Sequence, residues 1–182
     1  NKGWSITGDS FTNACLPADY SITTTGGNVV ITDVTGTGET LDVSQSGSNI
    51  RFSVTGKTYS IDGGAITAFT TPADVALAGK TSITINAGNG SDIINVGAFS
   101  SNLPSLTING GTGDDQVNMN GDIVFASNAN LDLDLQNDDA APGTDAVLFA
   151  SGTNINLQGT GTATIKVSKN VIFNTGSTLI TV

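Results

Sequence analysis

The feature that most constrains the fold of this 182-residue chain is an internal repeat of about 24 residues. Residues 82–96 (SITINAGNGSDIINV) align without gaps on residues 105–119 (SLTINGGTGDDQVNM), at an offset of 23. The apolar positions continue in columns, of which one contains Ile83, Leu106, Leu131, Ile155 and Leu179, and another contains Phe99, Phe125, Phe149 and Phe173. A fixed period of this length is typical of proteins whose structural units stack on one another.

Within each repeat, apolar and polar residues alternate, which is the period of a strand with one buried face. Three such stretches are separated by turns rich in Gly, Asn and Asp. Strands that recur in the same register are expected to pair in parallel, so that each column becomes a ladder in the core. The sequence therefore predicts an all-β fold, a right-handed parallel β-helix (β-solenoid) with about 24 residues per coil, and a ladder formed by the four Phe residues.

The repeat divides the chain into three parts. Residues 59–182 are predicted to form the regular coils, with a bulged loop at 136–146, where the polar segment QNDDAAPGTDA interrupts the pattern. Residues 28–58 contain alternating strands between Gly turns and are interpreted as irregular strands or early coils. Residues 1–27 show no repeat and are expected to form an N-terminal cap, because an exposed strand edge invites aggregation.

The composition excludes several classes of function. The chain has 16 acidic residues against 6 basic ones, which gives a formal net charge of −10, and it has no His. This charge argues against nucleic acid as a partner, because phosphate binding needs a basic surface. No apolar run approaches the roughly 20 residues of a membrane helix, so no membrane insertion is expected. Imidazole catalysis is excluded, and so is conventional zinc binding, since Cys15 is the only cysteine.

Two turns of the repeat carry candidate metal ligands. Residues 110–118 (GGTGDDQVN) fit the nonapeptide GGxGxDxUx, where U is a large apolar residue, and residues 87–95 (AGNGSDIIN) fit it except at the first position. Calcium takes about 6 to 8 oxygen ligands, which carboxylates and turn carbonyls can supply. The candidate ligands are Asp92, Asp114 and Asp115 with backbone oxygens of Gly88, Asn89, Gly111 and Thr112, and a weaker group is Asp138, Asp139 and Asp145 in the bulged loop.

The alternative interpretation of these turns is purely structural, because Gly and the short side chains of Asp and Asn suit tight connections between strands. Asp92 and Asp115 are expected to stack about one strand spacing, roughly 4.8 Å, apart. Two carboxylates at that distance repel each other unless a cation or a raised pKa relieves them. Both interpretations stay open, and no cofactor other than calcium is expected.

The 24-residue coils, the Thr-, Asn- and Gly-rich faces and the scattered GGxGxD turns together resemble the β-solenoid repeat regions of large bacterial secreted or cell-surface adhesin-like proteins. These are the RTX-like, haemolysin-type and filamentous-haemagglutinin-like proteins. The resemblance covers residues 59–182. It implies export, an extracellular or cell-surface location and a structural or adhesive role. The implied partner is a protein or glycan ligand, copies of the chain itself, or the rest of a longer chain.

Three functions are compatible with these features. The first is a non-enzymatic extracellular structural or adhesive module. The second is a self-assembling subunit of a filament, sheath or surface layer that stacks end to end. The strand STLITV at the open end of the ladder favours either of these two functions. The third is a β-helix polysaccharide lyase or hydrolase, with carboxylate pairs such as Asp92 and Asp115, or Asp115 and Asp145, about 5 to 9.5 Å apart. Because the lysines and aromatic residues are badly placed for such catalysis, no enzymatic activity and no catalytic residue are predicted.

Overall fold

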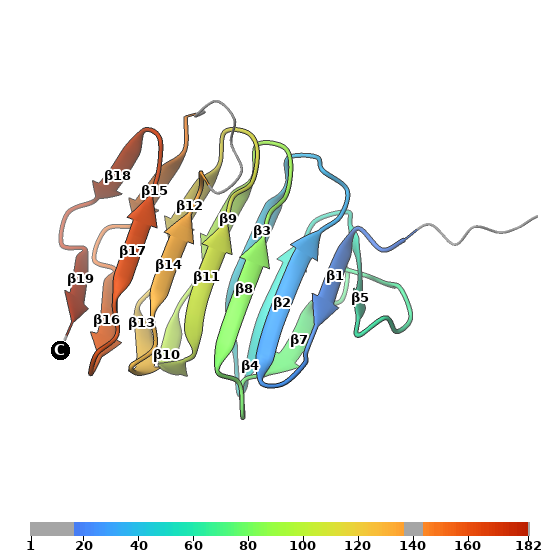
Figure 1. Cartoon of the computed structure of the whole chain (residues 1–182), viewed down its shortest axis with the longest axis horizontal. Coiled ribbons are helices and arrows are strands. Elements are labelled where there is room, and N and C mark those ends of the chain that lie inside the picture. The colour runs from blue at the N-terminus through green and yellow to red at the C-terminus, as the bar shows by residue number, and fades with distance from the viewer. Residues whose placement is uncertain (1–16, 137–143, 182) are drawn as a thin grey trace, which may run out of the picture.

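The computed structural model describes residues 17–136 and 144–181, and every regular element within these ranges is a β-strand. The nineteen strands form three sheets of eight, seven and four strands, which run side by side along the molecule (Figure 1). This confirms the predicted all-β fold. Cys15, Asp138 and Asp139 lie outside the described residues.

The order of the strands within each sheet differs from their order in the chain. The eight-stranded sheet contains, in spatial order, β17 (Ala163–Lys166), β14 (Leu131–Asp134), β11 (Ser105–Asn109), β8 (Ser82–Asn86), β2 (Asn28–Asp33), β1 (Tyr20–Thr23), β5 (Thr58–Ile61) and β6 (Thr67–Ala68). The seven-stranded sheet contains β18 (Asn170–Phe173), β15 (Ala146–Phe149), β12 (Gln116–Met119), β9 (Ile93–Val96), β3 (Thr40–Ser46), β4 (Asn49–Val54) and β7 (Ala73–Ala76). The four-stranded sheet contains β10 (Phe99–Leu103), β13 (Ile123–Ser127), β16 (Asn154–Gln158) and β19 (Thr178–Thr181).

From residue 82 onward the strands come in groups of three, which we call layers: layer 1 is β8–β10, layer 2 is β11–β13, layer 3 is β14–β16 and layer 4 is β17–β19. In each layer the first strand joins the eight-stranded sheet, the second the seven-stranded sheet and the third the four-stranded sheet. Equivalent strands of successive layers pair in parallel. Each layer therefore covers the one before it.

The core and the outer surface follow the alternation seen in the sequence. In the first strands of layers 1 and 2, every second residue is buried, and these buried residues meet their equivalents one layer away, as Ile83 meets Leu106. Polar residues between them face outward and also pair across layers. Asn109 Nδ2 donates a hydrogen bond to Asn86 Oδ1 at 2.8 Å. The same pair of strands is therefore stabilised by apolar packing on its inner face and by an amide hydrogen bond on its outer face.

The predicted ladder of four Phe residues is wrong. Phe99 and Phe125 belong to strands of the four-stranded sheet, whereas Phe149 and Phe173 belong to strands of the seven-stranded sheet. Phe149 stacks on Phe173, with 4.2 Å between ring centroids and 5° between ring planes. Phe99, however, pairs with Ile123. The equal spacing of the four residues in sequence therefore does not reflect one shared position in the layers.

The physical reason is that the layers differ in length. The first strands are offset by 23 residues between layers 1 and 2, since Ile83 pairs with Leu106, but by 32 residues between layers 3 and 4, since Leu131 pairs with Ala163. A fixed period of 24 residues therefore slips from one sheet to the next. The predicted column continues correctly as far as Leu131, but Ile155 pairs with Ile123 in the four-stranded sheet instead.

The residues before layer 1 form a different arrangement, with several antiparallel pairs. β2 and β3 pair in parallel with β8 and β9, so regular stacking extends to these two strands. The chain then extends the two larger sheets through β4, β5, β6 and β7. Tyr59, which the repeat places before Ile83, pairs instead with Tyr20 on β1. The strands at 28–46, and not those at 58–61, therefore precede layer 1 in the stack.

The glycines of the nonapeptide in layer 2 allow its turn to pack directly against the turn of layer 1. Gly111 and Gly113 have positive φ angles of 96° and 131°. A Cβ atom on Gly111 would lie 1.7 Å from Gly88 O, and one on Gly113 would lie 2.0 Å from Gly90 O. Both the backbone conformation and the close approach of two turns therefore require glycine.

This contact leads to a prediction with a matched control. Gly111→Ala should lower the free energy of unfolding by roughly 3 kcal/mol or more, because the turns must separate in addition to the strain at positive φ. Gly79→Ala should cost only about 1–2 kcal/mol, since Gly79 also has a positive φ but a Cβ there would meet nothing within 4 Å. Urea unfolding followed by circular dichroism measures both. Equal losses would show that the turns are not in close contact.

Candidate functional site

Buried acidic residues form a ladder along one end of the seven-stranded sheet. Asp92, Asp115 and Asp145 come directly before β9, β12 and β15, and each is at most 3% exposed. Asp115 N donates a hydrogen bond to Asp145 Oδ1 at 3.0 Å, and Asp92 N donates one to Asp115 Oδ1 at 2.9 Å. Glu39 N continues the series by donating to Asp92 Oδ1 at 2.8 Å. Each aspartate thus binds a backbone N–H group of the preceding stacked segment.

The two ends of this ladder have different partners. At the C-terminal end, Asp145 N donates to Ser168 Oγ at 2.8 Å, and the Ser168 hydroxyl lies 2.9 Å from Asp145 Oδ2, to which it donates. At the N-terminal end, the carboxylate of Glu39 forms an ion pair with Lys57 and accepts a hydrogen bond from the hydroxyl of Thr37. Among the described residues, the ion pair of the ladder is therefore at its N-terminal end, with Lys57.

The structure brings Asp92 and Asp115 together, as the repeat predicts, and it places Asp145 beside Asp115. Of the predicted turn oxygens, Gly88 O and Thr112 O accept hydrogen bonds from backbone N–H groups of the other turn. Thr112 N donates to Gly88 O at 3.0 Å, and Thr112 Oγ1 donates to Asn89 Oδ1 at 2.9 Å. The turn at Gly111 packs against that at Gly88. These hydrogen bonds give the turns a structural role, and a calcium ion held by them stays a prediction.

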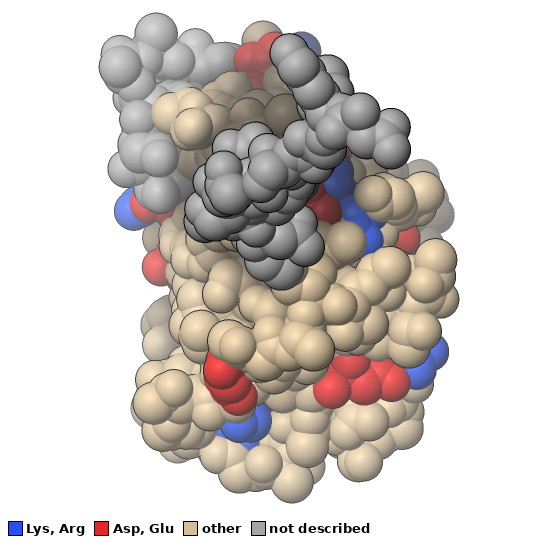
Figure 2. All heavy atoms as spheres, turned by 90° about the vertical axis from the view of Figure 1, so that its right-hand side faces the viewer, with Lys and Arg blue, Asp and Glu red and all other residues tan. Residues whose placement is uncertain are grey.

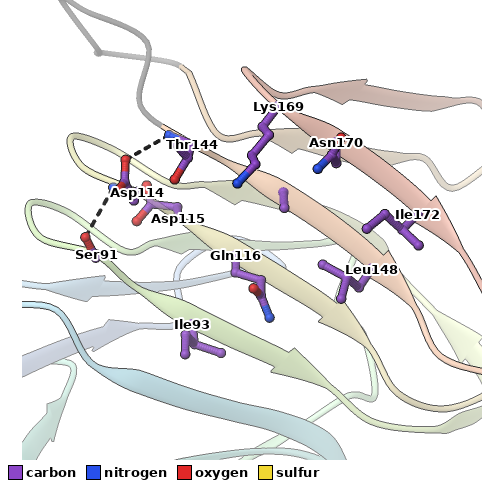
Figure 3. Close-up of a pocket in the computed structure, with 11 residues that line it drawn as sticks. Ser91, Ile93, Asp114, Asp115, Gln116, Thr144, Leu148, Lys169, Asn170 and Ile172 are labelled. Carbon is purple, nitrogen blue, oxygen red and sulfur yellow. Dashed lines mark hydrogen bonds between the residues drawn. The ribbon is translucent and has the colours of Figure 1, made fainter.

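Asp114 lies apart from the ladder, beside a groove on the outer face of the seven-stranded sheet (Figure 3). Its side chain is exposed, and Oδ1 accepts a hydrogen bond from Thr144 N at 2.8 Å. The groove has a volume of about 440 Å³, and residues that line it include Ser91, Ile93, Gln116, Leu148, Lys169 and Ile172. It offers charged, amide and aliphatic contacts on neighbouring strands.

Three carboxylates that the sequence did not group lie together at the N-terminal end of the ladder. Asp33 ends β2, Glu39 precedes β3 and Asp92 precedes β9. One carboxylate oxygen of each lies within 4.8 Å of one oxygen of each of the others. Glu39 comes to lie beside Asp92 because β3 and β9 pair in parallel, with Thr40 opposite Ile93.

A signal in the sequence pointed to Glu39. Residues 36–39 read Gly-Thr-Gly-Glu, which repeats the Gly-x-Gly turn before an acid that both nonapeptides contain. This turn does not match the nonapeptide repeat, because it is one residue shorter and because Glu replaces Asp. No comparable signal in the sequence identifies Asp33. Its position beside Glu39 depends on the path of the chain between β2 and β3.

Burial alters the pKa values in this group. It raises the pKa of Asp92 to about 7, and the neighbouring carboxylates act in the same direction. Burial also raises the pKa of Asp33. For Glu39, burial acts in the same direction, but hydrogen bonds from Lys57 and Thr37 outweigh it and leave the pKa below its ordinary value. The cluster therefore contains a well-paired anion beside two carboxyl groups whose ionisation is costly.

A pH dependence of stability is expected in the presence of a chelator. The unfolded chain loses the Asp92 proton above the ordinary pKa of 3.8, whereas the folded chain keeps it up to a pKa of about 7. The free energy of unfolding should therefore fall, by about 1.4 kcal/mol per unit of pKa difference, as the pH rises from about 4 to about 7. The raised pKa of Asp33 should also lower the free energy of unfolding as the pH rises.

Urea titrations of the wild type and of Asp92→Asn across this pH range test the expectation, and the variant should show a flatter profile. Asp62→Asn is the control, because the pKa of exposed Asp62 is lowered by hydrogen bonds from Thr24. Its contribution therefore lies at lower pH. A wild-type profile that is flat between these limits would show that Asp92 ionises normally.

No protein-family model, no curated protein and no solved structure matches the chain. Within the described parts of the chain, no helix has the length and apolar character needed to cross a membrane. At the end of the molecule near β1, β5 and β7, acidic and basic side chains form small separate groups on a mostly uncharged surface (Figure 2). Function is therefore inferred from the contacts of this chain's own residues.

Proposed function

We propose that this chain is a β-solenoid, a right-handed parallel β-helix, that serves as a non-enzymatic structural or adhesive module of an extracellular or cell-surface bacterial protein. The observation that carries the proposal is the parallel pairing of four successive layers across the same three sheets. Such a layer buries its apolar face only against its neighbours, so it is suited to building length. Right-handedness is expected because connections between parallel strands have this hand in about 98% of cases.

The polar contacts between layers support a structural role for the chain. Asn118 Nδ2 donates to Asn95 Oδ1 at 2.9 Å on the outer face of the seven-stranded sheet. The buried aspartates add backbone bonds between the same layers. Hydrogen bonds of this kind between layers are expected to keep the outer surface of the scaffold rigid. The groove beside Asp114, with Lys169 and aliphatic side chains on adjacent strands, supports adhesion to a protein or glycan. The bacterial surface location rests on the resemblance of the repeats.

The state of the carboxylates supports a non-enzymatic role over a polysaccharide lyase or hydrolase. A glycosidase exposes two carboxyl groups to its substrate, one as acid and one as base or nucleophile. The candidate pairs here involve Asp92, Asp115 and Asp145, which are at most 3% exposed. An oxygen of each already accepts a backbone hydrogen bond from the neighbouring segment. These carboxylates thus serve as hydrogen-bond acceptors for the protein's own backbone.

The proposed lack of catalysis is tested by incubating the chain with pectate, alginate and neutral polysaccharides, with and without calcium. Release of reducing ends and formation of unsaturated products should stay at the level of the buffer. The buried carboxylates give the physical reason, because Asp92, Asp115 and Asp145 are at most 3% exposed. Turnover that is lost in Asp115→Asn, while circular dichroism shows the variant still folded, would contradict the proposal.

A second candidate function, end-to-end self-assembly, is favoured by the exposed surface of layer 4. Val171 and Phe173 are the equivalents of Val147 and Phe149, which are fully buried, yet they are 40% and 48% exposed. Strands β17, β18 and β19 are also the last strands of their sheets. An apolar layer with free strand edges is what a further layer, from another copy of the chain, would cover.

Sedimentation velocity over a range of protein concentrations tests this assembly. The wild type should form elongated oligomers, and Phe173→Thr should weaken their association roughly 10- to 100-fold, because one buried aromatic side chain is lost from the contact. Ile172→Thr is the matched control, since Ile172 is 39% exposed on the same strand but faces the outer groove. A monomeric wild type, or a larger effect of the control, would contradict end-to-end assembly.

A further inference from the structure

The acidic cluster at the N-terminal end of the ladder has more buried oxygens than the described residues supply with donors. Asp33 Oδ1 accepts two hydrogen bonds from Thr35, from N and from Oγ1, both at 2.7 Å. Asp92 Oδ1 accepts from Glu39 N, and one oxygen of Glu39 binds Lys57. Each carboxylate therefore has one oxygen engaged.

The second oxygen of each carboxylate is buried and lacks a donor. Among the described residues, none donates a hydrogen bond to Asp33 Oδ2, Glu39 Oε2 or Asp92 Oδ2. The side chains of Asp33 and Asp92 are inaccessible, with 6% and 3% of the residue exposed. Burying a charged oxygen without a partner costs considerably more than burying a neutral polar atom. A bound cation or a proton would offset this cost.

We propose that Asp33, Glu39 and Asp92 together bind one divalent cation, with calcium as the best match. The charge balance agrees, because three carboxylates and the Lys57 ammonium leave a net charge of −2. The donor set agrees as well, since carboxylate oxygens without nitrogen or sulfur select calcium, magnesium or manganese. Calcium–oxygen distances of about 2.3 to 2.6 Å place opposite ligands up to about 5 Å apart. The spread of 4.8 Å between the carboxylates is within this limit.

This site differs from the calcium turns that the nonapeptides predict. Only Asp92 is common to both, and the other two ligands come from β2 and from the start of β3. In the nonapeptide turns, the Gly88 carbonyl bonds to Thr112 N, and Asp115 Oδ1 bonds to Asp92 N. At the cluster, by contrast, three carboxylates from separate chain segments each place one oxygen within 4.8 Å of the others.

The competing explanation is a proton instead of a metal ion. A proton shared by Asp33 and Glu39, or held by Asp92, would also relieve the repulsion between the carboxylates. The two explanations differ above neutral pH, where protons are scarce but calcium binds more tightly because its ligands are ionised. The measurements that distinguish the two explanations should therefore be made above neutral pH.

The experiment uses the full chain, treated with a chelator, dialysed and titrated with calcium chloride above neutral pH. Isothermal titration calorimetry should give one equivalent of calcium bound through this cluster, and the melting temperature should rise by several degrees at millimolar calcium. Potassium chloride at the same ionic strength controls for screening. No heat of binding and no calcium-dependent shift in the wild type would overturn the proposal in favour of the proton.

Isosteric variants decide which carboxylates bind the ion. Asp33→Asn and Glu39→Gln should each reduce the calcium affinity at least tenfold. Asp115→Asn is the matched control, because Asp115 is equally buried and next to Asp92 but outside the cluster, and it should keep the wild-type affinity. Calorimetry reads binding even where a variant alters stability. Loss of binding in Asp115→Asn with retention in Asp33→Asn would assign the ion to the nonapeptide turns and overturn the proposal. Neither result bears on the polysaccharide or assembly experiments.

Discussion

Parallel hydrogen bonding between equivalent strands of successive layers is the constraint on which the rest of this structure depends. Because side chains alternate with a period of two, the pairing of Ile83 with Leu106 decides for the whole strand which residues enter the core. A slip of one residue would turn the buried side chains outward and bring Asn86 and Asn109 into the core. The outer amide bonds between these two asparagines strengthen the same register.

The buried aspartates follow from this register. Stacked layers repeat about every 4.8 Å, and the tightly packed Gly turns bring consecutive acids to the beginning of adjacent strands. An aspartate is long enough to accept the N–H of the equivalent residue one layer away, so a side chain extends the backbone ladder where the strands have not yet started. This explains how Asp92, Asp115 and Asp145 are tolerated in the interior, since each provides a hydrogen bond that a neutral aliphatic residue would leave unmade.

Part of this could be predicted from the sequence, and the reasons for the rest are physical. Alternation and period identified the strands and the neighbours of Ile83, Leu106 and Leu131 correctly, because these layers have similar lengths. The Phe residues were misplaced because all three sheets have the same apolar alternation, so periodicity cannot tell one sheet from another once a layer changes length. Of the acidic cluster, the repeat identified Asp92 alone, because the turn before Glu39 is shorter than the nonapeptide turns and because long chain segments separate Asp92 from its neighbours. Glu39 and Asp92 are 53 residues apart, well beyond the repeat.

The acidic cluster lies where the regular stacking gives way to the antiparallel strands, and this position explains its excess of negative charge. Inside the layers, each aspartate accepts a hydrogen bond from a backbone N–H of the preceding segment. At Glu39 the series ends, and Asp33 approaches from β2 with no N–H of the described residues bonded to its second oxygen. Lys57, which directly precedes β5, compensates one of the three charges. A cation held there would join β2, β3 and β9, and would thus fasten the irregular N-terminal strands to the first regular layer. The site would then act on cohesion between the two parts of the chain.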